Sequence, residues 1–460
     1  MGEFRFFFAF SPKKHRGVLD KRSNTAIITV TLKVRNITSP SLLAFCPRCG
    51  DFFSADLKRS KKMNKTRLFG SIFAAAVLAV FLLACSNPAG PGGNQTQNRQ
   101  TPPTDGFTPV PPQFVTVVEQ LEWIRDYATD GTYVVWARAD EAIPAVAAGI
   151  IGSNIGSANI TVRIRSYGQT TPPPRRELTL TGGPGSMLTV EAGHTLYLYD
   201  IILTGNSANN ASLVTVTGGN LIMQNAVIRD NYAVRGGGVS VYNGTFTMNN
   251  SAVIHGNTTT VSSHSGSGGG VFLSSSTLTM NSGAVIHSNQ ALPLTISPST
   301  YGGGVHAVNS IVNMKGSSLI GGTAGQGNSS GLAGGVFLHA SQLNMYNDAA
   351  IIGNQTSYKG GGVYVWQSSI MRMRGPNVRV NNNQAGIQSG GIGFSVGSNR
   401  LYIYNGEIYG NTAPTNAALH IQNGTAAHGR WDNPNPGWNG VGTIGSTASN
   451  IRVENGIRTL

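Results

Sequence analysis

From residue 236 onward, apolar and polar positions alternate in short runs, and the arrangement of these runs repeats every 27–34 residues. Segments 236–257 and 268–289 show the repeat most fully. Each begins with a glycine cluster, continues with a run that starts at valine and a run that ends in Thr-Met, and closes with Ile-His-x-Asn. Alternation with a period of two predicts strands, and the Gly, Ser and Asn residues between them predict turns. A repeat of this length predicts a solenoid or a related repeat architecture.

The repeats recur through the second half of the chain. Glycine clusters lie at 236–238, 268–270, 302–304, 334–335, 360–362 and 390–391. The second run recurs as LIM, FTM, LTM, VNM, LNM, MRM and LYI, starting at residues 221, 246, 278, 312, 343, 371 and 401. The closing asparagine recurs at Asn231, Asn257, Asn289, Asn354, Asn383 and Asn411. The repeat near Leu319 departs from this pattern, because Gly322 stands where asparagine is expected.

Three short strands per repeat predict a coil with three faces. Stacked coils pair each strand with its equivalents above and below at about 4.8 Å, and they turn Val, Ile, Leu, Phe and Met inward into one column. Glycine supplies the backbone angles of tight corners, while asparagine tolerates left-handed geometry and can form hydrogen-bonded ladders. We therefore predict an all-β fold, a right-handed parallel β-helix of roughly ten coils and about 50 Å in length.

The two ends of the repeat region differ from its middle. Strand-like runs precede the explicit repeats at 133–136, 160–164, 178–180, 188–190, 196–202, 213–216 and 221–223. Before them, apolar residues at helical spacing predict a short amphipathic helix over 117–127, which we expect to cap the first coil. From Trp431 the chain departs from the repeat. We assign 114–430 to a parallel β-helix with its N-terminal cap, and 431–460 to a C-terminal cap.

The first 113 residues have no such repeat. Residues 1–62 are basic, and we predict that they precede the true start of translation at Met63. Residues 63–84 combine a positive start, an apolar run and small residues before Cys85, as a secretory signal peptide does. An uncleaved signal anchor is the alternative, although the run is short of the about 20 residues that a membrane span needs. Residues 85–113, rich in Pro, Gly, Asn, Gln and Thr, predict a disordered tether.

The end of this signal, Leu82-Leu83-Ala84-Cys85, resembles the lipobox of bacterial lipoproteins, Leu-x-(Ala/Gly)-Cys. The resemblance implies that Cys85 is lipidated and anchors the chain to a membrane. No cysteine follows it, so we expect packing rather than disulfides to stabilise the body. The remaining pair, at positions 46 and 49, offers two of the four ligands of a structural zinc site, and we expect no metal there.

The net charge of +14 comes mostly from the front of the chain. Residues 1–84 hold 15 of the 33 basic residues and 4 of the 19 acidic ones. The remainder has 18 basic and 15 acidic residues, a net charge of +3. The high isoelectric point is therefore no argument for a nucleic-acid partner, and we expect none.

The repeats resemble those of a known class of surface proteins. GGGV clusters followed by FTMN at 246–249 and LTMN at 278–281 are similar to the GGA(I/L/V) and FxxN signatures of polymorphic outer-membrane proteins. With the helix and strands that precede them, they resemble right-handed parallel β-helix proteins of the pectin-lyase-like superfamily. The resemblance implies a lipid-anchored protein of the outer membrane or cell surface that is adhesin-like or structural. The alternative that it implies is a polysaccharide lyase or glycoside hydrolase.

Catalysis of that kind requires acidic groups that converge in space. A glycosidase uses two carboxylates across the scissile bond, and lyases of the resembled fold use calcium-binding carboxylates with a basic residue. After residue 192 the acidic residues are Asp200, Asp230, Asp348, Glu407, Asp432 and Glu454, none of them adjacent or two apart. We assign no catalytic residue and no cofactor. Convergence of any of the first four beside an arginine or lysine would favour an enzyme.

Two histidines, His255 and His287, occupy the same position in successive repeats. Two stacked imidazoles could begin a metal site. The equivalent positions of other repeats hold Arg229, Gly353 and Tyr409, so no third ligand continues the column. We expect solvated histidines and no metal.

A stripe of large side chains is the predicted binding face. If the first-strand valines point inward, alternate positions point outward, and these include Tyr242, Phe272, His306, Phe337, Tyr364 and Trp366. Exposed aromatic rows are typical of surfaces that bind glycans or partner proteins. The alternative is that the connections 258–267 and 290–301 fold over the stripe and bury it. We expect a monomer in either case.

A small basic group lies in the sixth explicit repeat. Arg372 and Arg374 alternate with Met371 and Met373, and Arg379 follows. An anionic glycan could bind such a group. Alternation along a strand is also sufficient by itself to place these side chains in solvent.

Overall fold

The computed structural model describes residues 108–145, 159–168, 174–261, 268–293, 300–323, 325–395 and 399–415, together with short strands nearer both ends. The chain divides into two units, residues 1–100 and 101–460. In the first, β1 (Glu3–Ala9) pairs antiparallel with β2 (Ile27–Lys33), and β3 (Ser41–Phe45) pairs antiparallel with β4 (Phe52–Asp56). The predicted signal peptide, Cys85 and the tether as far as residue 107 lie outside the described residues.

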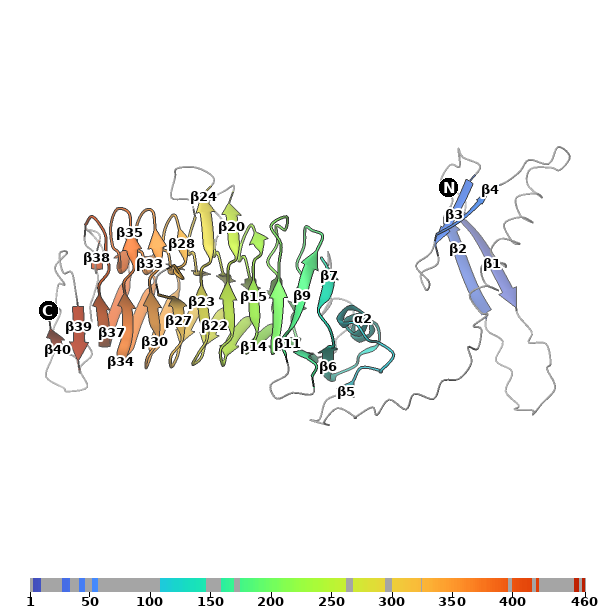
Figure 1. Cartoon of the computed structure of the whole chain (residues 1–460), viewed down its shortest axis with the longest axis horizontal. Helices are drawn as coiled ribbons and strands as arrows, with labels where there is room; N and C mark the ends of the chain where they lie inside the picture. Colours follow the sequence, from blue (N-terminus) through green and yellow to red (C-terminus); the bar gives the residue numbers. More distant parts are fainter. Residues whose placement is uncertain are drawn as a thin grey trace. The chain divides into compact units, whose positions relative to one another are not determined.

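The second unit is a parallel β-solenoid, which confirms the predicted fold class (Figure 1). Its first sheet has nine parallel strands: β10 (Leu188–Glu191), β13 (Val214–Thr217), β17 (Val239–Tyr242), β21 (Val271–Ser274), β25 (Val305–Val308), β29 (Val336–His339), β33 (Val363–Trp366), β36 (Ile392–Phe394) and β38 (Leu419–Ile421). These strands are the first strand of successive coils. Nine strands at about 4.8 Å span about 38 Å.

The second and third strands of the coils share one large sheet. Its second-strand members are β6 (Gly131–Ala137), β8 (Ile160–Ser166), β11 (Thr195–Tyr199), β14 (Asn220–Gln224), β18 (Thr245–Asn249), β22 (Thr277–Met280), β26 (Ile311–Met314) and β30 (Gln342–Tyr346). Its third-strand members are β7 (Glu141–Pro144), β9 (Arg176–Thr181), β12 (Ile201–Thr204), β15 (Val227–Arg229), β19 (Val253–His255), β23 (Val285–His287), β27 (Leu319–Gly321) and β31 (Ala350–Ile352). In β34 (Ile370–Asn381) and β37 (Arg400–Tyr409) the second and third strands are continuous.

The prediction of three strands per coil is incomplete. A fourth, short strand follows the closing asparagine in six coils and forms a separate parallel sheet. Its members are β16 (Tyr232–Ala233), β20 (Thr258–Val261), β24 (Gln290–Pro293), β28 (Ser329–Ser330), β32 (Gln355–Thr356) and β35 (Gln384–Ala385). The residues of these strands are mostly polar and differ from one repeat to the next. Their alternation is therefore hard to recognise in the sequence.

The core is a set of stacked apolar columns, as the repeat pattern predicts. The first-strand column pairs Val239, Val271, Val305, Val336, Val363 and Ile392 in register. The Thr-Met runs supply a second column of Met248, Met280, Met314, Met345 and Met373. All of these side chains are fully buried. Burial of each such side chain is worth about 1.5–3 kcal/mol relative to leaving it exposed, so the column stabilises every coil through its neighbours.

The helix predicted over 117–127 is α2 (Val117–Tyr127). Thr116 caps its first turn, and Glu119 completes a capping box with the Thr116 backbone. Such a reciprocal pair satisfies two backbone N–H groups that the helix start would leave free. Leu121 and Ile124 are fully buried in the same apolar cluster as β6. The helix therefore covers the N-terminal end of the core, while β5 (Thr108–Pro109) pairs with β6 at the edge of the large sheet.

The corners explain the glycine clusters. The first residue of four clusters has a positive φ, from 54° at Gly236 to 78° at Gly268, a region that side chains disfavour. In the two clusters with only two glycines, Ala333 and Ser389 occupy this position, each with φ 64°. The second glycine is required for a different reason: a Cβ at Gly237 would overlap the carbonyl oxygen of Gly269 in the next coil. Coil spacing therefore depends on the absence of a side chain there.

The closing asparagines form a buried ladder. The side-chain Nδ2 of Asn257 donates to Oδ1 of Asn289 at 3.0 Å, and the same bond repeats from Asn289 to Asn328 and onward through Asn354, Asn383 and Asn411. Each of these residues is no more than 5% exposed. The irregular repeat is therefore complete: the chain makes a detour after Gly322, and Asn328 occupies the ladder position.

A second ladder, of serines, lies at the corner between the first and second strands. The backbone N–H of Ser276 donates to Oγ of Ser310 at 3.0 Å, and the bond repeats from Ser310 to Ser341 and from Ser341 to Ser369. The N–H of Ser369 then donates to Oδ1 of Asn399. These hydroxyls satisfy backbone groups that the corner removes from water.

The parallel order ends in the tail. β39 (Ile451–Glu454) pairs antiparallel with the third-strand part of β37, and β40 (Ile457–Thr459) pairs antiparallel with β39. An antiparallel strand cannot continue the stacking of coils, so it closes this edge of the large sheet. The rest of the predicted C-terminal cap, residues 431–450, lies outside the described residues.

Candidate binding surfaces

The structure places the predicted aromatic stripe on the outer side of the first sheet. Neighbouring strands pair Phe272 with His306, His306 with Phe337, and Phe337 with Tyr364. Ring centroids along this column are 5.3, 5.1 and 5.9 Å apart. The register expected from the repeats is therefore correct.

The stripe is nevertheless covered, so the predicted exposed face is wrong for four of its six residues. Phe272, His306, Phe337 and Tyr364 are 5, 5, 1 and 8% exposed. Described residues that lead into glycine clusters lie against them: the guanidinium of Arg235 is 5.7 Å from the ring of Phe272. Tyr301 packs on Phe337 with a centroid distance of 4.8 Å, and Leu332 and Ala333 belong to the same apolar cluster.

Only the ends of the stripe keep accessible surface. Tyr242 and Trp366 are partly exposed. Trp366 packs on His339 at 4.6 Å, and Nε2 of His339 bonds with Oε1 of Gln367 at 2.7 Å. The stripe thus stabilises the connections of the solenoid, and it offers two separate rings rather than a continuous surface.

His306 is the unusual member of the stripe. Rings of Phe272, Tyr301 and Phe337 surround it, and neither of its ring nitrogens has a hydrogen-bond partner among the described residues. Burial lowers the pKa of His306 to about 3, with smaller effects from His339 and Arg235. The imidazole therefore stays neutral and acts as an apolar filler that retains an unsatisfied polar edge.

A different surface is open: the outer side of the second strands in the large sheet. We call it the arginine–tyrosine face. Ten strands, from β6 to β37, present alternate side chains there in continuous register. These outward positions, including the residues that directly follow β22 and β26, contain six basic residues and no acidic one. The basic residues are Arg163, Arg165, Lys315, Arg372, Arg374 and Arg400.

Arginines alternate with aromatic rings in the first coils of this face. The guanidinium of Arg165 lies 4.9 Å from the ring centroids of both Trp136 and Tyr199. Arg163 lies 5.3 Å from the ring of Tyr197. These five side chains are all partly exposed. Contact with a ring holds the guanidinium plane in place, so its N–H edges have a defined direction.

A second cluster of the same composition occupies the last coils. Arg372 lies 5.4 Å from the ring of Tyr402, and Arg374 lies 4.7 Å from the ring of Tyr404. Arg372 also donates to Oε1 of Gln342 at 3.1 Å. Two of the three arginines singled out from the sequence therefore belong to this face. Arg379 does not, because it lies on the third-strand part of β34, in register with Glu407.

Amides and hydroxyls fill the face between the two clusters. Successive strands present Gln224, Asn249, Asn281, Asn313 and Asn344, and Nδ2 of Asn281 donates to Oδ1 of Asn249 at 2.6 Å. Among the described residues, Arg165, Arg372 and Arg374 form no salt bridge, whereas Arg125 and Arg229 do. The face therefore carries positive charge at both ends, with neutral groups and the single charge of Lys315 between them.

The acidic residues do not form a catalytic group. Asp200 accepts from Asn225 at one corner, and Asp348 accepts from Asn377 at 2.7 Å several coils away. Asp230 lies 3.6 Å from Arg229, and Glu407 faces Arg379 in a much later coil. None of these four carboxylates converges with another.

Among the described residues, Glu177 approaches Asp230 through a shared arginine. It accepts from Arg229 at 3.0 Å and from Thr204 at 2.5 Å. These two hydrogen bonds, the Thr204 bond first, lower the pKa of Glu177. A general acid of a glycosidase needs a raised pKa, so Glu177 does not suit that role.

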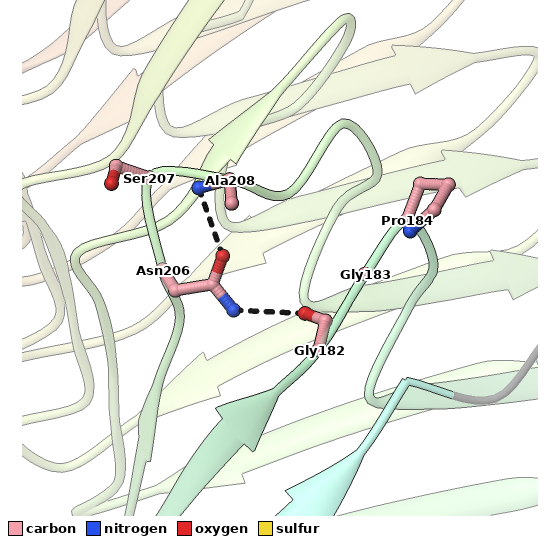
Figure 2. Close-up of a pocket in the computed structure, with 6 residues that line it drawn as sticks. All are labelled: Gly182, Gly183, Pro184, Asn206, Ser207 and Ala208. Atoms are coloured by element: carbon pink, nitrogen blue, oxygen red, sulfur yellow. Dashed lines mark hydrogen bonds between the residues drawn. The ribbon is translucent and has the colours of Figure 1, made fainter.

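A shallow hollow lies between two turns near the front of the solenoid. Figure 2 shows Gly182, Gly183 and Pro184 on one side and Asn206, Ser207 and Ala208 on the other. Nδ2 of Asn206 donates to the Gly182 carbonyl at 3.1 Å, and its Oδ1 accepts from the Ala208 N–H at 2.9 Å. The asparagine thus ties the turns together. The lining has no charged side chain, so the hollow offers no acid–base chemistry.

His255 and His287 are stacked, as their repeat positions predict. Their ring centroids are 5.1 Å apart and the ring planes differ by 3°. Arg229 precedes them in the column, and Gly321 and Ile352 follow. The expected Gly353 is therefore wrong by one residue. Among the described residues, no group of three or more His, Cys, Asp or Glu side chains is placed to hold a metal ion.

No helix among the described residues is long and apolar enough to cross a membrane. No protein-family model, no curated protein and no solved structure matches this chain.

Proposed function

We propose that this protein is an extracytoplasmic surface protein that binds linear anionic glycans along the arginine–tyrosine face. The observation that carries the proposal is the charge distribution of that face: six basic side chains and no acidic one across ten strands. A surface of one sign attracts a polyanion and orients it along the row of charges.

The residue types favour carboxylate or sulfate groups on a sugar chain. Between residues 108 and 415 the chain has twelve arginines and two lysines. A guanidinium binds planar anions through two parallel N–H bonds, which an ammonium cannot do. Aromatic rings beside the arginines suit the apolar faces of sugar rings, and the amides between the clusters suit hydroxyl groups.

The spacing of the two clusters adds a requirement on length. From β11 to β34 the second strands span six steps, or about 29 Å. A polymer that reaches both clusters gains from bivalent attachment, by a factor of about 10²–10⁴ over one that reaches a single cluster. The middle of the face, where Lys315 is the one charged side chain, then serves as a track.

The remaining features of the proposal rest on the sequence. A lipid at Cys85 and a tether over 85–113 would hold the solenoid away from the outer membrane or cell surface, as in the β-helix surface lipoproteins that the repeats resemble. One lipid chain anchors a protein only weakly, and stable attachment needs more than one. Metabolic labelling with a fatty-acid analogue, in wild type and in Cys85→Ala, tests this part separately.

The test of glycan binding compares charge-matched variants of the full chain. Immobilised polygalacturonate is the anionic probe, and dextran is the uncharged one. Arg165→Gln with Arg374→Gln removes one charge from each cluster, while Arg125→Gln with Arg175→Gln removes two charges elsewhere. We expect the first pair to weaken polygalacturonate binding and the second to leave it near wild type. Equal losses for both pairs, or equal binding of dextran, would contradict the proposal.

Two further readings come from the same samples. Oligomers shorter than about 29 Å should bind more weakly than the polymer by the bivalent factor of about 10²–10⁴. An assay for new reducing ends addresses the alternative of a polysaccharide-processing enzyme. Release of reducing ends by wild-type protein, lost when Glu177 is changed to Gln, would replace binding with catalysis.

A further inference from the structure

Although the repeat pattern led us to expect no metal at His255 and His287, we propose that these two residues form a site for a divalent late first-row transition metal, with Cu²⁺ bound most tightly. The site lies on the outer side of the third strands, away from the arginine–tyrosine face and independent of its function. In Figure 1 the labelled strands β15, β23 and β27 lie along this row, and β19 pairs between β15 and β23.

The backbone sets the two imidazoles in register. His255 ends β19, His287 ends β23, and the two are directly paired in the parallel ladder. Their rings are parallel within 3° at 5.1 Å between centroids. Metal–nitrogen bonds are about 2.0–2.1 Å and lie in the plane of the imidazole ring, so a shared ion requires the two nitrogens to come within about 4 Å and both rings to turn toward each other. The terminal torsion of histidine has a broad minimum that permits such a rotation.

One ring has an outer hydrogen bond that can orient it. Nδ1 of His287 bonds with Oγ of Ser288 at 2.9 Å. In the tautomer in which Nδ1 donates this bond, Nε2 carries the lone pair that coordinates an ion, and such an outer hydrogen bond commonly fixes a metal-binding histidine.

The charges around the pair favour a cation. Arg229 precedes His255 in the column, but its guanidinium lies 3.0 Å from Glu177 and 3.6 Å from Asp230. Two carboxylates and one guanidinium leave a net charge of −1 beside the pair. The charge of Asp230 favours positive charge at the His255 ring, and the charge of Arg229 opposes it less strongly.

The following coil leaves the site open. Gly321 continues the column after His287, and it has no side chain to cover the ring. A Cβ at Gly321 would overlap the carbonyl oxygen of Ile352, so the gap is imposed by the backbone. Water can therefore complete the coordination shell of an ion held by two protein ligands. Imidazole ligands suit Cu, Ni and Zn, and affinity rises from Ni²⁺ to Cu²⁺ in the usual order.

The experiment is a Cu²⁺ titration of the full chain with its three cysteines alkylated, so that thiols neither bind nor reduce the ion. Wild type is compared with His255→Gln, His287→Gln and the control His339→Gln, which removes an unrelated surface histidine. Two ligands on one scaffold act as a chelate, so loss of either should weaken the site by about 10²-fold or more. The control should match wild type.

Electron paramagnetic resonance of the bound Cu²⁺ provides the second reading. We expect hyperfine structure from two nitrogens in wild type and from one in each of the two single variants. Circular dichroism verifies that the variants are folded. Unchanged affinity in His287→Gln, or a wild-type spectrum with a single nitrogen, would overturn the proposal, as would an equal loss in His339→Gln.

Discussion

Replacement of Asn289 by alanine should test how the asparagine ladder stabilises the solenoid. The side chain of Asn289 lies at the centre of the ladder and is fully buried. Its Oδ1 accepts from the N–H and from Nδ2 of Asn257, at 3.1 and 3.0 Å. Its Nδ2 donates to the carbonyl oxygens of Ile254 and His287 and to Oδ1 of Asn328, at 3.0, 2.8 and 3.0 Å.

The magnitude follows from the groups that lose a partner. Nδ2 of Asn257 retains two carbonyl acceptors, and Oδ1 of Asn328 retains the backbone N–H of residue 289. The buried N–H of Asn257 loses its acceptor, and the carbonyl of Ile254 loses this donor. A buried polar group left unsatisfied costs about 1–3 kcal/mol. We therefore expect Asn289→Ala to lower the free energy of unfolding by about 2–6 kcal/mol, a large part of the usual 5–15 kcal/mol.

Guanidinium denaturation, approached from both the folded and the unfolded side, measures this loss. The control is Gln290→Ala, one residue further along the chain but exposed, which should change stability by less than about 0.5 kcal/mol. Hydrogen exchange supplies the local reading, since the amide of Asn257 should lose protection first. The reasoning fails if Asn289→Ala has the same guanidinium midpoint as the control and the Asn257 amide stays protected from exchange.

An aspartate at the same position separates donation from acceptance. Asn289→Asp keeps the acceptor for Asn257 and loses both hydrogens of the amide. Its carboxylate would face the carbonyl of Ile254 without solvent, so at neutral pH the variant should be less stable than Asn289→Ala. Protonation restores one donor, and the deficit should shrink as the pH falls. A deficit that grows on acidification would contradict this account.

Three further predictions concern single positions. Gly303→Ala should lower the free energy of unfolding by about 1–3 kcal/mol, because a Cβ there would overlap the carbonyl oxygens of Ser329 and Gly334; an unchanged denaturation midpoint would contradict it. Ser389→Gly should raise stability by about 1 kcal/mol, because this residue has φ 64° and a buried hydroxyl without a partner; thermal unfolding measures the rise. His306→Phe should flatten the acid side of the stability profile. The pKa of His306 is about 3 in the folded protein and about 6.5 in the unfolded chain, so below pH 6.5 the unfolded chain takes up the proton. The free energy of unfolding of wild type should then fall by up to about 1.4 kcal/mol per pH unit, and that of the variant should not. Equal slopes of the denaturation midpoints between pH 7 and pH 4 would refute this prediction.

The sequence was sufficient to predict the columns of the core, because each coil repeats the same apolar positions against the same neighbours. The irregular coil shows the limit of this reasoning. Asn257 and Asn289 lie four residues after Val253 and Val285, so the same spacing from Leu319 leads to Thr323, one residue beyond the expected Gly322. The ladder instead requires an asparagine at a fixed position in the stack of coils. Five additional residues bring Asn328 to that position.

The serine ladder was not predicted for a related reason. Ser276, Ser310 and Ser341 each precede a second strand, but serine is frequent at every corner of this chain. Composition therefore cannot separate the serine that accepts a backbone N–H from one that faces solvent. A search for serine at a constant offset before the Thr-Met runs would have found it.

The binding surface was only partly predictable. The outward positions of the first strands were identified correctly, but whether Phe337 is exposed depends on where the preceding connection lies, and Tyr301 covers it. The arginine–tyrosine face was harder to find. Its clearest part, around Arg165 and Tyr199, lies in early coils without a recurrent motif, so only strand pairing reveals that these residues are neighbours.

The two sides of the solenoid differ because their surroundings differ. Residues of the connections, such as Tyr301 and Leu332, lie over the first sheet and pack against Phe337. That ring therefore stabilises the fold and is not accessible to a ligand. No described connection covers the second strands, and the rings there, such as Tyr199 and Tyr402, pack instead against arginines. Because each strand of a parallel stack lies directly above its equivalent, one outward arginine per strand becomes a row of charge along the axis. A ligand that matches such a row must itself be long, linear and negatively charged.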